Sequence, residues 1–160
     1  MPDQPSILTI ILIAGGLVVV TVLIHAVGFD VLLRAMMRSH ALTASGFRRL
    51  TLFVIGLACS LILIHLVEIS VWGLFYFWQC CLPDAESAWY FSGVTYTGSG
   101  YGDLVLPTPW RKLAPVETLT GILMCGFSTG LFFAVVSRWI GNRMHRITAL
   151  RDHSAEAMNK

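Results

Sequence analysis

One glycine-rich stretch carries the residues whose types and spacing point most directly to chemistry, Thr95-Tyr96-Thr97-Gly98-Ser99-Gly100-Tyr101-Gly102-Asp103. Glycine at alternate positions gives a backbone access to positive φ angles that other residues avoid. Successive carbonyl oxygens can then point to one side and replace the water shell of a dehydrated cation. We therefore interpret residues 98–102 as a cation filter in which the backbone binds the ion. The expected ligands are the carbonyl oxygens of Gly98, Ser99, Gly100 and Tyr101.

The composition of the chain excludes a soluble globular domain. Of its 160 residues, 56% are hydrophobic and only 12% are charged, whereas soluble chains carry about 25% charged residues. Apolar side chains in that proportion need lipid as their solvent. The sequence has no phosphate-binding loop and no basic domain interleaved with aromatics, so neither nucleotide chemistry nor nucleic-acid binding is expected. We expect an integral membrane protein that is not an enzyme.

The apolar runs that are long enough to cross a bilayer are residues 7–29, 50–78 and 116–140. A hydrocarbon core about 30 Å thick takes about 20 residues of helix. The shorter run 87–97 cannot span, and it predicts a re-entrant half-helix that Asp84 or Ser87 caps. The C-terminal end of this half-helix carries partial negative charge, which favours a cation at the filter. The predicted fold is an all-α membrane protein with three transmembrane helices, a pore helix and a filter loop.

Basic side chains are unevenly distributed between the two sides of the predicted spans. Of the 11 Lys and Arg residues, four lie in 30–49, five lie from Arg138 onward and two lie between the second and third spans. Cytoplasmic segments carry the excess of Lys and Arg, so both basic segments are expected in the cytoplasm and the N-terminus outside. Residues 30–49 are then a basic loop or a helix on the membrane surface, and 141–160 form a short cytoplasmic helix. The plasma (inner) membrane is the expected location.

This order of segments resembles the pore module of potassium channels. The most specific match is Tyr90-Phe91-Ser92 and Thr95-x-Thr97, followed by Gly100-Tyr101-Gly102-Asp103. The resemblance covers about residues 50–140, as outer helix 50–78, pore helix 87–97, filter 98–102 and inner helix 116–140. Residues 1–49 add an extra helix and the basic loop before this module, and 141–160 add a basic tail.

The resemblance also implies how the chain assembles and what it does. It implies a homotetramer in membrane lipid, because one filter loop per chain cannot surround an ion. It implies passive conduction of potassium, with K⁺ ions in the pore and no other cofactor. No nucleic acid and no soluble partner is evident. Thr95, Thr97 and Asp103 are expected to support the filter.

The filter departs from that family at two positions. The family reads Thr-Val-Gly-Tyr-Gly, or Ile or Leu in place of Val, where this chain has Gly98 and Ser99 before Gly100. Gly98 lacks the threonine hydroxyl that the family uses at the innermost cation site, and Ser99 replaces an apolar residue that packs behind the filter. Three interpretations stay open: a potassium-selective channel, a channel that also admits sodium, and a membrane subunit that does not conduct.

Glu68 is the one acid well inside a predicted span. A carboxylate in lipid is costly and marks a functional position. Glu68 is expected to brace the pore helix or the back of the filter by a hydrogen bond, to pair with His65 three residues before it, or to be an interfacial group. The spacing is not the His-Glu-x-x-His pattern of zinc enzymes, so no catalytic metal is expected. His25, near the end of the first span, is expected to be a polar residue by the membrane interface and not a ligand.

Three glycines lie within the third predicted span, Gly121, Gly126 and Gly130. A glycine in a membrane helix serves close helix packing or bending. Packing is the expected role for most of them, and Gly121 and Gly126 are also candidates for a gating hinge.

The four cysteines fall into two pairs. Cys59 and Cys125 lie within spans and are expected to be buried. Cys80 and Cys81 are expected on the outer side, where oxidising conditions permit disulfides. Neighbouring cysteines pair poorly with each other, so a disulfide here would link two chains.

Overall fold

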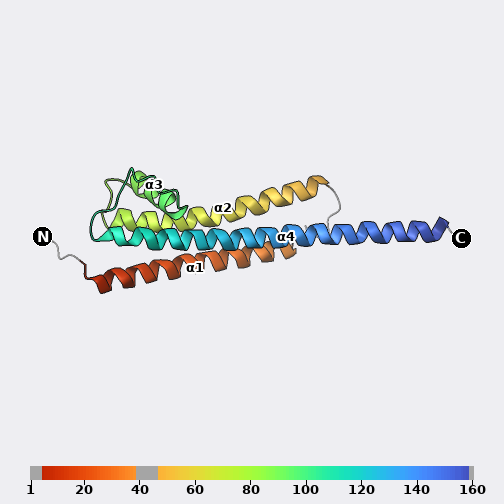
Figure 1. Ribbon diagram of the computed structural model, residues 1–160, viewed down its shortest axis with the longest axis horizontal. Helices are drawn as coiled ribbons and strands as arrows, with labels where there is room; N and C mark the ends of the chain where they lie inside the picture. Colours follow the sequence, from red (N-terminus) through yellow and green to blue (C-terminus); the bar gives the residue numbers. More distant parts are fainter. Residues whose placement is uncertain (1–4, 39–46, 159–160) are drawn as a thin grey trace.

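The computed structural model describes residues 5–38 and 47–158. In this part of the chain every regular element is a helix (Figure 1). The elements are α1 (Ile7–Arg38), α2 (Phe47–Trp78), α3 (Ala85–Tyr96), a short 3₁₀ turn η2 (Trp110–Lys112) and α4 (Leu113–Met158). The predicted all-α fold is therefore confirmed.

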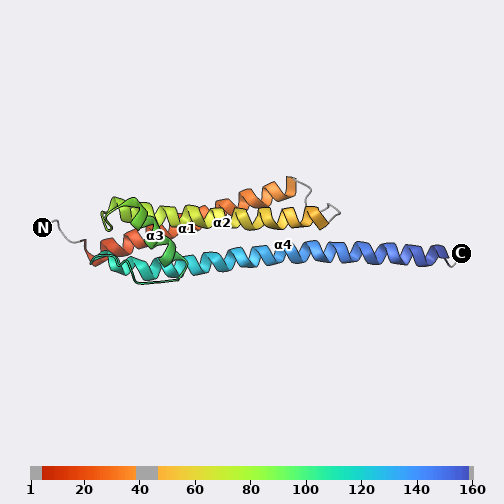
Figure 2. The same ribbon diagram turned by 90° about the horizontal axis from the view of Figure 1, so that it is seen from above.

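The three long helices lie along one another, and α3 packs at one end of the bundle (Figures 1 and 2). α1 and α4 run in the same direction and α2 runs in the opposite direction. The short α3 contacts both α2 and α4. The segment from α3 to η2, which contains the glycine stretch, thus lies at the end of the bundle where α2 ends and α4 begins.

Among the described residues, three helical segments have the length and apolarity of membrane spans, Ile7–Arg38, Thr51–Trp78 and Trp110–Gly141. Large apolar side chains cover their outer faces; for example, Leu52 is 68% exposed and Phe133 is 72% exposed. Such a surface is stable in lipid and costly in water. The chain is therefore a membrane protein, and the three predicted spans are confirmed.

The first helix continues past the predicted boundary at residue 29. α1 runs without interruption to Arg38, so the interpretation of residues 30–38 as a loop or a separate surface helix is wrong. An ion pair one helical turn apart supports the continuation, since Arg34 Nε lies 2.9 Å from both Asp30 carboxylate oxygens. Residues 39–46, the rest of the predicted basic loop, lie outside the described residues.

The other helix boundaries shift as well. α2 begins at residue 47 instead of 50, and α3 covers 85–96 instead of 87–97. The predicted division between an inner helix 116–140 and a separate tail helix is wrong, because α4 is a single helix of 46 residues. Pro115 is the last proline in the chain, and it lies in the first turn of α4, where a missing N–H is tolerated. Hydropathy marks where the lipid contact ends, whereas the helix continues until a residue breaks its hydrogen bonds.

Two hydrophobic clusters hold the helices together. The larger one surrounds α3 and joins it to the long helices through Trp72, Tyr76, Phe91, Tyr96 and Leu113. The smaller one lies further along the bundle and is formed by Met36, Leu57, Leu61 and Val135. The large aromatic side chains therefore gather where α3 must be held in place.

Neither cysteine within a span is buried. Cys59 is exposed on α2 and Cys125 is partly exposed on α4, so the expectation for both was wrong. A position inside an apolar run does not indicate burial when the outer face of every helix is itself apolar. Cys80 is exposed and Cys81 is buried, and both are free thiols.

Candidate filter and its supports

The short helix α3 begins at a capping aspartate. Asp84 has an extended backbone, and its Oδ1 accepts a hydrogen bond from the Ser87 N–H at 2.7 Å. The Ser87 hydroxyl donates to the other oxygen of Asp84 at 3.1 Å. Of the two predicted caps, Asp84 takes that role and Ser87 is its partner. This bond fixes where α3 starts. The length of α3 then fixes where the glycine stretch begins.

The backbone after α3 alternates in handedness at the glycines. Gly98, Gly100 and Gly102 have φ angles of +74°, +56° and +76°. Only glycine adopts these angles without strain. The N–H groups of Ser99 and Gly100 both point to the Val94 carbonyl oxygen, at 3.0 and 3.3 Å. These two bonds fasten the beginning of the stretch to the last turn of α3, and residues 98–102 are exposed on the single chain.

Polar side chains hold both ends of this stretch. At the far end, the Tyr90 hydroxyl donates to Asp103 Oδ2 at 2.8 Å, which connects the residue after Gly102 back to α3. This hydrogen bond to Asp103 raises the pKa of the Tyr90 phenol, so the bond is present at neutral pH and is lost only when the phenol ionises under alkaline conditions. At the near end, Thr97 Oγ1 donates to the Gly93 carbonyl at 2.8 Å and lies 3.1 Å from Ser99 Oγ.

Helix α4 contacts the backbone at the C-terminal end of α3. The Thr118 hydroxyl donates to the Thr95 carbonyl oxygen at 2.9 Å. One turn further, a Cβ atom added at Gly121 would lie 2.0 Å from the Tyr96 carbonyl oxygen. Gly121 therefore provides close packing, one of the two roles expected for it. α4 is a continuous helix through Gly121 and Gly126, and bending at either residue stays a prediction.

A second buried acid holds α3 from the side of α4. Glu117 is fully buried. Its Oε2 accepts from the Tyr76 hydroxyl at 2.7 Å, and its Oε1 lies 2.5 Å from Ser92 Oγ. Ser92 Oγ is also 2.9 Å from the Ile69 carbonyl oxygen, so its single proton serves one acceptor at a time. This arrangement links α2, α3 and α4 through one carboxylate.

Glu117 was not singled out from the sequence, so its role between α2, α3 and α4 was missed. An acid followed by a long apolar run was the available signal, because such a carboxylate needs polar partners when it is buried. Nothing in the local spacing pointed to Tyr76 and Ser92, which lie 41 and 25 residues away along the chain.

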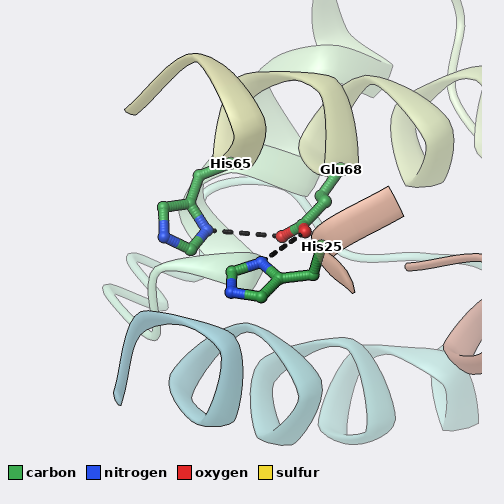
Figure 3. Close-up of side chains that lie close together, drawn as sticks. All are labelled: His25, His65 and Glu68. Carbon is green, nitrogen blue, oxygen red and sulfur yellow. Dashed lines mark hydrogen bonds and ion pairs between the residues drawn. The ribbon is translucent and has the colours of Figure 1, made fainter. Parts of the chain in front are cut away.

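Glu68 is also fully buried, and it contacts side chains from two other helices. The Tyr96 hydroxyl, from the last residue of α3, donates to Glu68 Oε2. His65 Nδ1 lies 3.3 Å from the same oxygen, and His25 Nδ1 from α1 lies 2.7 Å from Oε1 (Figure 3). Both expected contacts of Glu68 are therefore present, the one to the pore helix and the one to His65.

The sequence predicted that His25 lies at the membrane interface, but its side chain is buried inside the bundle. It is only 4% exposed and lies between α1 and α2, against Glu68 and the ring of Phe29. The expectation failed because the partner is 43 residues away in sequence. A histidine near the end of an apolar run is compatible with either position until that partner is known.

Residues 62–138 match a family model described as ion channel. This part of the chain belongs to that ion channel family. The matched residues of the channel include Glu68, all of α3, the glycine stretch and Glu117, whereas α1 precedes them. No curated protein and no solved structure matches the chain. Membership of a channel family agrees with the expectation of a transport protein in a membrane.

Proposed function

We propose that this channel conducts potassium through a homotetrameric pore, with a filter formed by the backbone carbonyls of Gly98, Ser99, Gly100 and Tyr101. The observation that carries the proposal is the set of left-handed glycines that directly follows a short helix between two membrane-length helices. This feature lies within the residues that match the ion channel family.

The length of α3 supports a re-entrant pore helix. Its 12 residues extend about 18 Å, which is too short for a bilayer core of about 30 Å. Its C-terminal end, which carries partial negative charge, leads directly into the filter and favours a cation there.

Exposure of the filter supports assembly from several copies. One loop cannot surround an ion, and Tyr101 is 73% exposed on the single chain. Identical chains arranged in a closed ring place this loop at a common axis and cover its surface. In such a ring a cation exchanges its water shell for fixed carbonyl dipoles. This is passive transport, in which no bond is made or broken and no cofactor takes part.

The supports of the filter are assigned from the same contacts. The Tyr90–Asp103 bond fixes its outer end, and the Val94 carbonyl fixes its inner end. Glu68 and Glu117 brace α3 from two sides through Tyr96 and Ser92. Selectivity depends on the spacing of the oxygens, so these bonds maintain the geometry on which discrimination depends.

Ion flux from liposomes tests the proposal directly. Purified protein in potassium-loaded liposomes should release potassium, and Gly100→Ala should abolish the release because alanine is strained at a φ of +56°. Gly130→Ala is the matched control, since a Cβ there meets nothing within 4 Å among the described residues. Absence of flux from folded wild-type protein would favour the non-conducting membrane subunit instead.

The residues before Gly100 favour a second candidate, a channel with weak discrimination between potassium and sodium. Gly98 offers no hydroxyl at the innermost site, and the exposed Ser99 hydroxyl lies near Thr97. We expect Ser99→Val to increase the preference for potassium, because it places an apolar residue behind the filter at a position that does not have a positive φ. The measurement is the reversal potential under opposed potassium and sodium gradients. Equal reversal potentials for wild type and Ser99→Val would show that the serine at this position does not set selectivity.

The protein is proposed to lie in the plasma (inner) membrane, with its N-terminus outside and its C-terminus in the cytoplasm. Cysteine labelling tests this orientation. A membrane-impermeant thiol reagent added to intact cells should modify Cys80, which is exposed between α2 and α3. Cys81 should react far more slowly, because it is buried and burial raises the pKa of its thiol to about 11. Cys80→Ser should remove the rapid labelling. If Cys80 is labelled only in permeabilised cells, the orientation is the reverse of the proposed one.

A further inference from the structure

Polar side chains from three helices converge on Glu68 inside the bundle. His25 comes from α1, His65 and Glu68 come from α2, and Tyr96 is the last residue of α3. The nitrogen and oxygen atoms of the two histidines and Glu68 that face this centre all lie within 4.8 Å of one another. Figure 3 shows the two imidazole rings on the same side of the carboxylate, each with one nitrogen directed at it.

We propose that His25, His65 and Glu68 bind one divalent transition-metal ion of the zinc class, with the Tyr96 oxygen as the fourth ligand. Imidazole nitrogen and carboxylate oxygen are the donors that zinc takes in proteins besides thiolate. Two imidazoles and one carboxylate also form a common ligand set for zinc. The site is separate from the carbonyl filter and does not rest on the proposed potassium conduction.

The spacing of the donor atoms is close to that of a tetrahedral site. Bonds of about 2.0–2.2 Å to a tetrahedral ion place neighbouring ligands about 3.3–3.6 Å apart. His65 Nδ1 lies 3.3 Å from Glu68 Oε2 and 3.1 Å from the Tyr96 hydroxyl oxygen. His25 Nδ1 lies 2.7 Å from Glu68 Oε1. The two His65 contacts are therefore close to the separation of a tetrahedral site, whereas the Glu68 contacts with His25 and with Tyr96 are shorter and must lengthen when one ion replaces the shared protons.

The charge of the cluster favours a cation. Among the described residues the ion-pairing partners of Glu68 are His25 and His65, and neither carries a permanent charge. A buried carboxylate without a positive partner is costly. A divalent ion supplies the missing charge, and a phenolate at Tyr96 would make the site neutral. The protons that now lie between the donors are released to water when the ion binds.

The outer contact of the His65 imidazole fits the same role. His65 Nε2 lies 3.0 Å from Ser128 Oγ on α4, which holds the ring with Nδ1 toward the centre. Ligand histidines are usually held through their second nitrogen in this way. Within the described residues, His25 Nε2 is buried without a hydrogen-bond partner, so this ring is held only through its Nδ1 contact with Glu68.

The first experiment measures metal content. The whole chain is produced in zinc-containing medium, purified in detergent without chelators, and analysed by elemental mass spectrometry. Wild type should retain one zinc ion per chain more than His25→Gln or Glu68→Gln. Zinc held by the cysteines or by other histidines is present in wild type and variants alike, so the difference between them reports the proposed site. Glu117→Gln, which alters the other buried carboxylate of the bundle, should retain as much zinc as wild type.

The second experiment needs no variant. Chelator-treated wild type is titrated with Co²⁺, and the visible absorption typical of four-coordinate Co²⁺ should appear and saturate at one equivalent. Zinc should then remove this absorption and raise the midpoint of thermal unfolding.

Two results would overturn the proposal. One is a Co²⁺ spectrum in wild type that matches the aqueous ion, with an unfolding midpoint that zinc does not move. The other is equal zinc content in wild type and in folded His25→Gln. Either result would mean that the cluster holds only protons.

Discussion

Replacement of Gly121 by alanine is expected to prevent stable packing of α3 against α4. The added Cβ would lie 2.0 Å from the Tyr96 carbonyl oxygen and 2.8 Å from its carbonyl carbon. These are backbone atoms, so no side-chain rotation relieves the clash and the two helices must separate. Overpacking of this kind costs about 3 kcal/mol or more, which is a large part of the stability of most domains. Separation also displaces Tyr96, which lies two residues before Gly98 at the start of the glycine stretch.

The measurement compares Gly121→Ala with Gly126→Ala in detergent. Both are the same substitution in the same helix, and a Cβ at Gly126 meets nothing within 4 Å. We expect Gly126→Ala to be recovered as folded protein with wild-type unfolding behaviour, and Gly121→Ala to be recovered poorly and to release no potassium from liposomes. Equal stability of the two variants would contradict the close contact between α3 and α4.

Replacement of Glu117 by alanine is expected to destabilise the bundle by about 3–5 kcal/mol, because the Tyr76 and Ser92 hydroxyls lose their partner and a cavity remains. Both hydroxyls are buried, so water cannot replace the carboxylate readily. Unfolding in mixed micelles, followed by tryptophan fluorescence, measures the change.

Two further variants show whether the hydrogen bonds are responsible. Glu117→Gln keeps a bonding side chain of the same length and should recover most of the stability. Glu86→Ala removes an exposed carboxylate from the first turn of α3 and should change the free energy of unfolding by less than about 0.5 kcal/mol. A loss of stability in Glu86→Ala as large as that in Glu117→Ala would indicate a general effect of charge.

The parts of the fold that depend on local sequence were predictable. An apolar run of sufficient length predicts a span, and an acid before a short helix predicts its cap. Alternate glycines predict left-handed backbone, and Gly98, Gly100 and Gly102 all have it. Each of these inferences uses only neighbouring residues, which is why they needed no knowledge of the packing.

The partners of buried polar groups were not predictable from the sequence. Glu68 attracted attention as an acid in a span, but its contact with His25 depends on how α1 packs against α2. The contact of Glu117 with Ser92 depends in the same way on the position of α3. The ends of α1 and α4 were missed for a different reason. Charged residues end an apolar run, but they do not end a helix whose hydrogen bonds can continue in water.

The unbroken length of α4 has a mechanical consequence. Its 46 residues extend about 69 Å, and about 35 Å of this lies beyond Val135, where the smaller hydrophobic cluster holds the helix against α1 and α2. The part beyond that cluster is a stiff lever arm whose fulcrum is the cluster. A tilt of about 5° moves the far end by about 3 Å while the fulcrum barely shifts. A weak pull on the last turns of α4 therefore acts as a stronger force over a shorter distance where α4 contacts α1 and α2.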